Sequence, residues 1–424
     1  MKWQIIQGDS LDALRLMADD SADSLVCDPP AGIGFMGRDW DRDKGGRDQW
    51  IAWLAAILRE AYRVLKPGAH GLVWALPRTS HWTGMACEDA GFEVRDKVVH
   101  LFGSGFPKSL NLGNGWGTAL KPAAEDWWLI RKPLRGTVAA NVQQFGTGAL
   151  NIEGCRIASN DGFERAWDQP VRTNVGAKGG AYITVGVQHA VDISANKPSG
   201  RWPAHLVLSH TPDCTDDACA AGCAVAMLDE QSGMSKDGVA VHRNGHDETK
   251  RGYDGGWGVG PRPDQGYGGQ GGASRFFYCA KPSSAEREVG CDGLPKSGAG
   301  ELVDRQEGSA GMSSPRAGAG RTSAGRGNTH PTVKSVDLMR WLVRLITPPN
   351  GIVLDPFAGS GTTGIAALLE RCRFVGIELD PHHADICRAR ISAAERGDIH
   401  TTSDGSTKLR EPDDPRQVSL LDLA

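Results

Sequence analysis

Hydrophobic residues follow two alternating spacings along the first 134 residues of the chain. Three short apolar runs are typical of strands: Trp3–Ile6, Ser24–Cys27 and Gly71–Leu76. Apolar positions also recur at helical spacing, over Leu11–Met17 and Gln49–Leu65. Strands that alternate with helices in this way predict an α/β fold.

The alternation stops near residue 134 and returns sharply at Pro331. Before the break we expect three more elements, a helix over His81–Ala90 and strands over Phe92–Phe102 and Trp127–Arg131. After it we expect helices over Val336–Ile346, Thr363–Glu370 and His382–Glu395, with strands over Ile352–Leu354 and Arg373–Ile377.

The intervening stretch, Arg135–Thr329, has few periodic runs, and glycine dominates Arg251–Arg275, so we expect an insertion outside the sheet. Gly, Ser, Ala and interspersed Arg over Ala299–Asn328 are typical either of a mobile loop that closes over a phosphate backbone or of a solvated linker. The polar stretch after residue 396 predicts a disordered tail. The chain therefore divides into residues 1–134, 135–329, 330–396 and 397–424.

Composition narrows the class of protein. The 424 residues carry a net charge of −4, which excludes a uniformly basic nucleic-acid coat, so any DNA contact must be local. Neither a signal peptide nor a run of eighteen apolar residues is present, and we expect a cytoplasmic protein with no membrane partner. Ten cysteines in such a chain favour free thiols or metal ligands over disulfides.

Three of these cysteines cluster with a histidine. His210, Cys214, Cys219 and Cys223 give the pattern H-x3-C-x4-C-x3-C, which supplies four ligands for one tetrahedral zinc. The spacing is not a common zinc-finger pattern, and reduced cysteines in a polar loop are the alternative. The neighbouring Asp213, Asp216 and Asp217 argue against an apolar role.

A glycine-rich turn joins an expected strand to an expected helix at Asp355–Thr363. Glycine at such a turn lets a ligand approach the backbone closely. Glu378 ends the next strand, at a spacing similar to that of the acidic residue that binds ribose in nucleotide-binding βαβ units. The turn lacks the third glycine of the dinucleotide pattern and the lysine of a phosphate-binding loop. A generic packing turn is the alternative.

Near the N-terminus, the strand Ser24–Cys27 runs into Asp28-Pro29-Pro30. The two prolines fix the backbone and have no N–H, so this turn presents hydrogen-bond acceptors. Acceptors are what methylation of an aromatic amino group requires, because its lone pair is delocalised into the ring. The Asp28 carboxylate and the Pro29 carbonyl would accept both amino hydrogens and favour a tetrahedral nitrogen.

These two segments together resemble the amino-directed DNA methyltransferases. Asp28–Pro30 is similar to their D-P-P-Y catalytic motif, and Asp355–Thr363 to their DPF-x-GSGTT cofactor motif. His330–Lys334 resembles the HPT-x-KP segment that precedes the cofactor motif, with Ser335 in place of the second proline. The order of catalytic motif, recognition region and cofactor motif is that of the beta class.

The resemblance implies a Rossmann-like fold with permuted motif order, and S-adenosylmethionine as cofactor. It implies that Asp355 meets the methionine part, Glu378 the ribose and Asp9 the adenine. The other implied cofactor residues are Thr332, Lys334, Phe357, Gly359, Ser360, Gly361 and Thr362. Residues 135–329 are then the target-recognition insertion above a cleft where Asp28 lies beside Asp355 and Glu378.

Ala31 departs from the family pattern, which places at this position the aromatic ring that stacks on the target base. Phe35 and Trp40 in the following loop are the candidate substitutes. The base must leave the duplex to expose its amino group. Loss of the ring would weaken activity, and an inactive, degenerate enzyme is the alternative.

We therefore expect a site-specific methyltransferase of double-stranded DNA that acts on adenine N6, because the cytosine N4 enzymes more often carry serine in place of Asp28. Cytosine N4 methylation is the nearest alternative. A catalytically silent DNA-binding protein, or an enzyme acting on RNA or a small molecule, are others. The sequence leaves open the recognition site, the oligomeric state and any pairing with a restriction nuclease.

The tail carries one further motif. Gln417, Ser419, Leu420 and Leu421 resemble the peptide with which replication proteins bind the sliding clamp. A plain tail without a partner is the alternative.

Overall fold

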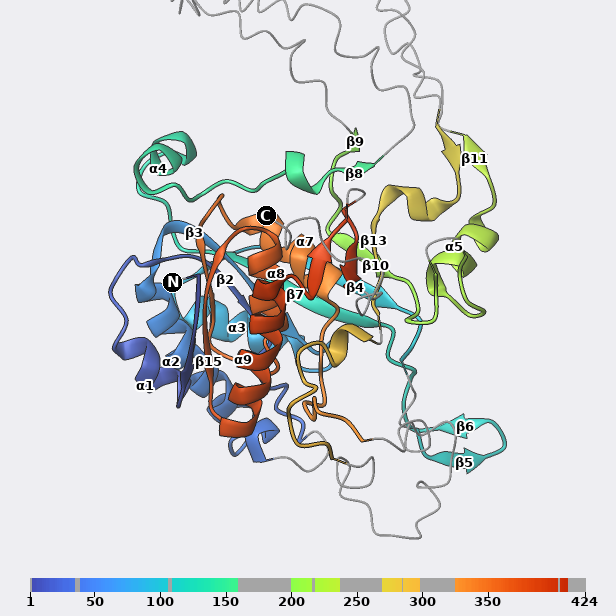
Figure 1. Ribbon diagram of the computed structural model, residues 1–424, viewed down its shortest axis with the longest axis horizontal. Coiled ribbons are helices and arrows are strands. Elements are labelled where there is room, and N and C mark those ends of the chain that lie inside the picture. The colour runs from blue at the N-terminus through green and yellow to red at the C-terminus, as the bar shows by residue number, and fades with distance from the viewer. Residues whose placement is uncertain are drawn as a thin grey trace, which may run out of the picture.

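A nine-stranded sheet forms the centre of the molecule (Figure 1). The computed structural model describes residues 2–34, 39–105, 109–158, 200–215, 218–236, 269–283, 285–297, 325–402 and 405–410. The strands lie in the order β1-β15-β14-β2-β3-β7-β4-β10-β13. Their bounds are β1 Trp3–Gln7, β2 Ala22–Cys27, β3 Leu65–Ala75, β4 Glu93–Phe102, β7 Ala124–Arg131, β10 Leu206–Ser209, β13 Tyr278–Ala280, β14 Ile352–Asp355 and β15 Arg373–Glu378.

The sheet is parallel except around β7, which runs antiparallel to both β3 and β4. The parallel part is apolar because helices cover both of its faces; all six residues of β2 are buried. Beyond β4, the short strands β10 and β13 continue the sheet in parallel. The expected α/β fold is confirmed.

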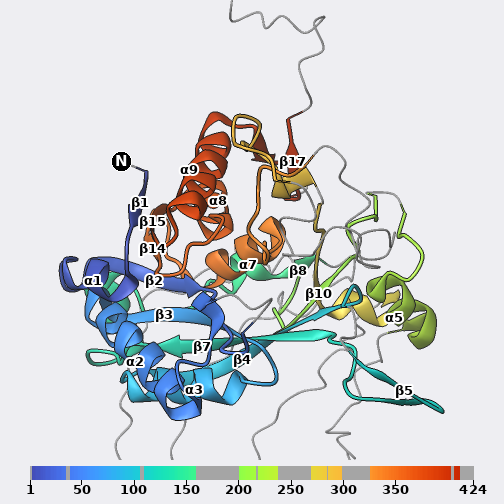
Figure 2. The same cartoon turned by 90° about the horizontal axis from the view of Figure 1, so that it is seen from below.

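Helices from opposite ends of the chain cover opposite faces (Figure 2). The N-terminal helices are α1 Ser10–Arg15, α2 Arg47–Val64 and α3 Ser80–Asp89, and the C-terminal helices are α7 Val336–Ile346, α8 Thr362–Leu369 and α9 Pro381–Arg396. Each group has its own apolar core against the sheet. Trp50, Leu54 and Leu58 of α2 are buried in one core, and Trp341 and Leu342 of α7 in the other.

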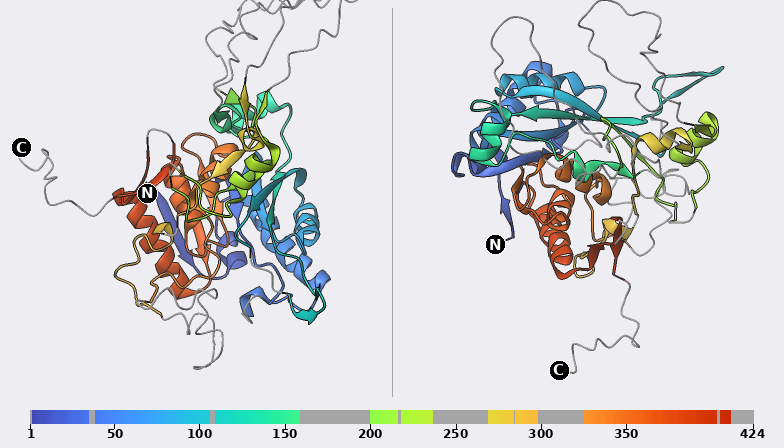
Figure 3. Two further views of the ribbon diagram at one scale, coloured as in Figure 1. Left: turned by 90° about the vertical axis from the view of Figure 1, so that its right-hand side faces the viewer. Right: turned by 90° about the horizontal axis from the view of Figure 1, so that it is seen from above.

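The remaining elements are small. The helix α4 Val138–Phe145 packs near β3, and α5 Ala224–Ser232 follows β10. Single turns of 3-10 helix are η2 Asp39–Asp41, η3 Glu153–Cys155, η6 Ala273–Phe276 and η7 Ala285–Arg287. Two-stranded ribbons pair β5 Asn111–Gly113 with β6 Trp116–Gly117, β8 Ile157–Ala158 with β9 Gly200–Arg201, β11 Ser235–Lys236 with β12 Gln270–Gly271, and β16 Ile399–Thr401 with β17 Thr407–Leu409. The β5–β6 ribbon extends away from the sheet (Figure 3).

Two expectations about organisation were wrong. The segment 135–329 does not lie wholly outside the sheet, because β10 and β13 are strands of it. The region after residue 396 is not a featureless tail, because β16 and β17 form a ribbon that meets α7: Arg340 Nη1 donates to the carbonyl of Gly405 at 2.9 Å and to Thr407 Oγ1 at 2.8 Å. The domain boundaries themselves stay a prediction.

Strand connections reverse direction at the middle of the sheet. From β14 the chain crosses through α8 to β15 on one side, and from β2 it crosses through α2 to β3 on the other. Where neighbouring strands lead away in opposite directions, their carboxyl ends leave a crevice that binds ligands in α/β folds. The crevice here lies between the ends of β14 and β2.

Candidate active site

Acidic residues follow or end four adjacent strands at this crevice. Asp355 ends β14, and Asp28 follows β2, whose Leu25 pairs with Leu354. Glu378 ends β15, and its carbonyl accepts from Gly8 N at 2.9 Å, just before Asp9. The expected gathering of residues from both ends of the sequence at one edge is therefore present.

The cofactor-motif loop is fastened to its neighbouring strand. Asp355 is buried, and its Oδ1 accepts from Phe357 N at 3.0 Å. Glu378 Oε2 accepts from Gly359 N at 2.8 Å, and its Oε1 accepts from Asp380 N at 2.9 Å. These bonds satisfy backbone groups that the turn would otherwise leave unpaired, so the loop has one fixed shape.

The loop glycines make room for protein atoms. Gly359 has a φ of +51°, and a Cβ there would lie 2.9 Å from His330 Nε2. Gly361 has a φ of +79°, and its Cβ would lie 2.7 Å from Cys387 Sγ. The His330–Lys334 segment and α9 therefore approach the loop closely at these two glycines, where a ligand was expected to do so.

A buried arginine of α9 holds the same loop. Arg390 is fully buried, and its Nη1 donates to the Ser360 carbonyl at 2.6 Å, and to Ser360 Oγ and Thr362 Oγ1 at 3.1 Å each. Its Nη2 donates to the carbonyl of Glu286 in η7 at 3.0 Å. Ser360 and Thr362 therefore have their side chains occupied by Arg390, which the sequence did not single out.

Lys334 joins the two motifs. Its Nζ lies 3.3 Å from Asp28 Oδ2 and 3.5 Å from Oε1 of Glu125 on β7. It also lies 4.1 Å from the ring centroid of Trp74, at the end of β3. One ammonium therefore bridges two carboxylates over an aromatic face, at a site from which most water is excluded.

Burial and charge set the protonation of these acids. Burial raises the pKa of Asp28 to about 6, with Lys334 opposing the shift and Glu125 adding to it. Burial also raises the pKa of Asp355 to about 7, opposed by hydrogen bonds from Thr363 and Phe357. Burial acts to raise the pKa of Glu125 too, but Lys334 and His100 outweigh it, and the value is about 2.

The catalytic turn is held by a few bonds beyond the prolines. Thr79 Oγ1 donates to the Ala31 carbonyl at 3.0 Å. Asp41, almost fully buried, accepts from Gly32 N at 3.0 Å. Trp40, a stacking candidate, lies half-buried in η2 next to Asp41, whereas the other candidate, Phe35, lies outside the described residues.

The other expected site residues lie around this edge. Asp9 is exposed and caps α1, accepting from Leu11 N at 2.9 Å. Phe357 packs against Trp53, with ring centroids 5.9 Å apart. Thr332 is half-buried, and its N–H donates to His330 Nδ1 at 3.4 Å.

The metal candidates are brought together elsewhere. His210, Cys214, Cys219 and Cys223 place one potential ligand atom each within 4.8 Å of all the others. Asp216, Asp217 and the four clamp-motif residues lie outside the described part of the chain. None of the described helices combines the length and apolar character needed to cross a bilayer.

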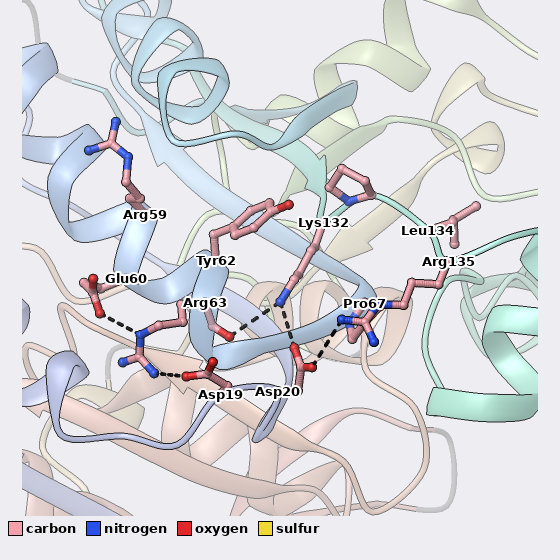
Figure 4. Close-up of a pocket in the computed structure, with 11 residues that line it drawn as sticks. Asp19, Asp20, Arg59, Glu60, Tyr62, Arg63, Pro67, Lys132, Leu134 and Arg135 are labelled. Carbon is pink, nitrogen blue, oxygen red and sulfur yellow. Dashed lines mark hydrogen bonds and ion pairs between the residues drawn. The ribbon is translucent and has the colours of Figure 1, made fainter.

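A cavity of about 560 Å³ lies at the opposite edge of the sheet, near the start of β2 and β3 (Figure 4). Most of its charged side chains pair with one another: Lys132 Nζ lies 2.8 Å from Asp20, and Arg63 pairs with Asp19 and with Glu60. This cavity holds none of the residues of the two motifs.

Part of the chain is similar to a known protein family. The profile of the DNA methylase family N6_N4_Mtase matches residues 257–389, a range that includes the cofactor loop and the first half of α9. Over this range the chain is similar to the N6/N4 DNA methylase family. The match does not extend to the catalytic turn, so the position of that turn beside the cofactor loop comes from the fold.

Relatives of this chain include known DNA methyltransferases. The Type II methyltransferase M2.DpnII of Streptococcus pneumoniae is 39% identical over 64 residues, which are 15% of this chain and 24% of that protein. The DNA adenine methyltransferase YhdJ of Escherichia coli (strain K12) is 38% identical over 65 residues, 15% and 22% of the two chains. The chain thus spans 22% to 30% of the length of the first curated relatives it matches. Among solved structures, the cytosine-N4-specific PvuII DNA methyltransferase aligns over 93% of this chain and 92% of its own, at 12% identity and a TM-score of 0.44.

Proposed function

We propose that this protein transfers a methyl group from S-adenosylmethionine to the exocyclic N6 amino group of adenine in double-stranded DNA. The observation that carries the proposal is the placement of Asp28 beside Asp355 at the crevice where the strand connections reverse. An acceptor-rich turn and a nucleotide-type loop then open into the same space.

The residues at the loop fit the cofactor. Asp355 would bind the positively charged amino group of a methionine moiety, and that charge would favour the ionised form of a carboxyl whose pKa burial raises to about 7. Glu378 keeps lone pairs for ribose hydroxyls beyond its two backbone bonds, and Asp9 at the neighbouring strand end is exposed for an adenine. When bound, the cofactor supplies an electrophilic methyl group on sulfur.

Asp28 and the Pro29 carbonyl would bind the amino hydrogens of a base that has left the duplex. Accepting both hydrogens directs the nitrogen lone pair toward the methyl donor, and alignment of the reacting atoms supplies much of the rate. Lys334 opposes the effect of burial on Asp28 and so favours the ionised, accepting form. Trp40 is the proposed stacking partner for the base, in place of the missing ring at Ala31.

Residues 135–329 are proposed to read the DNA sequence. Of these, β10 and β13 extend the sheet at the edge farther from β14, so the segment reaches the DNA from the side of the cleft. We propose adenine over cytosine because the cytosine N4 enzymes more often carry serine at the position that Asp28 occupies in the D-P-P turn.

The test is methyl transfer followed by identification of the product. Full-length protein, labelled S-adenosylmethionine and DNA of varied sequence should yield N6-methyladenine on nucleoside analysis, and Asp28→Ala should form it about 10²- to 10³-fold more slowly. N4-methylcytosine as product would replace adenine by cytosine in the proposal. Failure of the wild type to label any DNA while still binding it would favour a silent DNA-binding protein.

A further inference from the structure

Four side chains with metal-binding atoms gather just beyond the end of β10. His210 follows the strand directly, and its Nδ1 lies 3.4 Å from both Cys219 Sγ and Cys223 Sγ. In a tetrahedral zinc site, Zn–N and Zn–S bonds of ordinary length place nitrogen and sulfur about 3.6 Å apart. The four atoms, all within 4.8 Å of one another, therefore need little movement to surround one ion.

The local backbone is folded to present these sulfurs. Cys214 Sγ accepts from Ala220 N at 3.2 Å and lies 3.2 Å from Thr211 Oγ1. Cys223 is the first residue before the nine-residue helix α5, so its sulfur lies at a helix N-terminus. Backbone N–H donors and helix N-termini stabilise thiolate over thiol, and thiolates are the form that binds metal.

Packing alone gives this loop little support. Among the residues that the structure describes, the apolar cluster around it has three buried members, Leu208, Cys223 and Val225, and its other members are partly buried. Cys219 is exposed and Cys214 half-buried, so these two residues are not placed by burial. A small core of this kind usually needs a cross-link or a metal to hold one shape.

We propose that His210, Cys214, Cys219 and Cys223 bind one structural Zn²⁺. The four positions are all protein side chains, which leaves none for water or substrate and makes the site structural. Ligands from a strand end, a turn and a helix start would be tied together by one ion.

The proposed ion lies at the end of a row of polar contacts that leads to the catalytic acid. Ser209 precedes His210, and its Oγ lies 2.8 Å from His100 Nε2. His100 Nδ1 lies 3.5 Å from Glu125 Oε2, and Glu125 lies 3.5 Å from Lys334 Nζ. The metal would thus help to fix β10 beside β4, and with it the proposed recognition segment.

The test compares metal content in full-length proteins purified without chelator from zinc-supplemented cells. Wild type and Cys279→Ser should each hold about one zinc per chain. Cys279 is the matched control, because it packs in the same apolar cluster and is not one of the four ligands. Cys214→Ser and Cys219→Ser should lose most of the zinc, at least about tenfold in affinity.

Cobalt gives a second readout, which for the wild type does not depend on how any variant folds. Wild type stripped of metal and refilled with Co²⁺ should show the absorption of a tetrahedral thiolate complex, and Cys219→Ser, altered at an exposed position, should not. A wild type with zinc content near zero and no cobalt spectrum overturns the proposal, as does equal zinc in Cys219→Ser. Neither measurement needs DNA or S-adenosylmethionine, so the result stands apart from the proposed methyl transfer.

Discussion

The cofactor loop after β14 and the catalytic turn after β2 occupy equivalent places on adjacent parallel strands, yet they are built differently. Each carries an aspartate whose pKa is raised by burial. Asp355 is then stabilised by hydrogen bonds from its own loop, whereas Asp28 depends on the charge of Lys334, which comes from a distant segment.

The contacts that hold the cofactor loop also differ from those that hold the catalytic turn. The cofactor loop is fixed by Glu378, His330 and Arg390, which leaves it one conformation. The catalytic turn is held mainly by Thr79 and Asp41. A rigid loop suits the proposed cofactor, which is the same in every reaction cycle. A turn controlled by charge suits the proposed target base, which must enter from DNA. Changes in the loop should therefore alter cofactor binding, and changes in the turn should alter the chemical step.

The largest effect is expected at Asp28. Asp28→Ala should lower kcat by about 10²- to 10³-fold, the loss typical of removing one preorganised hydrogen-bond partner of a transition state. Binding of S-adenosylmethionine, measured by calorimetry, should stay unchanged. Asp12→Ala, at an exposed aspartate of α1, serves as control. An equal loss of cofactor affinity in Asp28→Ala would erase the contrast between the two turns.

Asp355→Asn should have the opposite effect, with weaker binding of S-adenosylmethionine and a nearly unchanged chemical step. Its amide oxygen can still accept from Phe357 N, but the negative charge is lost. Affinity for S-adenosylmethionine should fall by about 10- to 100-fold, as expected when a hydrogen bond to a charged group is lost. At saturating cofactor kcat should recover most of its value. A kcat that stays low at saturation would place Asp355 in the chemical step.

Arg390→Lys should weaken the contacts that hold the cofactor loop and leave the catalytic turn unchanged. Lysine cannot reach both the Ser360 and Glu286 carbonyls, and an unsatisfied buried carbonyl costs about 1–3 kcal/mol. The free energy of unfolding by denaturant should fall by that amount, and KM for S-adenosylmethionine should rise. Arg388→Lys, whose side chain pairs only with the exposed Asp385 among the contacts described, is the matched control and should change neither quantity.

The smallest expected effect is a shift in pH dependence. In wild type, kcat/KM should fall as the pH drops through about 6, because protonated Asp28 has lost its negative charge and is a weaker acceptor for an amino hydrogen. Lys334→Met removes a charge that lowers the pKa of Asp28, so this limb should move to higher pH, by about one unit. Glu125→Gln removes a charge that raises it, so the limb should move to lower pH. Shifts in the same direction for both variants would exclude this charge control.

The fold could be predicted where apolar residues repeat over long enough stretches. The helices α1 to α3 and α7 to α9 and the strands β1, β2, β4, β7, β14 and β15 were predicted within a few residues, because buried strands and amphipathic helices have strong patterns. The strand β3 begins at Leu65, before its expected start at Gly71, and the helices α4 and α5 were missed. The strands β10 and β13 were missed since they have four and three residues, and their sheet partners lie far away in the sequence. Short strands of this kind are determined by tertiary pairing more than by local pattern.

Site residues that belong to a sequence motif were predicted. Residues that gain their role only from the place they take in the folded protein were missed. Glu125 is one of two adjacent acids before Trp127, and nothing local tells which of them meets Lys334. Arg390 did leave a signal, because it falls at helical spacing with Ile386 and Cys387 on the apolar face of α9. An arginine on such a face needs buried acceptors, and these come from η7 and the cofactor loop.

The pairing of β14 with β2 also has a consequence for when the protein becomes active. Ile352 N donates to Asp23 Oδ2 at 2.7 Å across 329 residues of sequence. Contacts of such long range form late and slow the folding of a chain. During translation, one edge of β2 stays unpaired until β14 has emerged from the ribosome. Nascent chains that end before Asp355 therefore lack the crevice altogether, and the proposed methyl transfer can begin only after β14 has been translated.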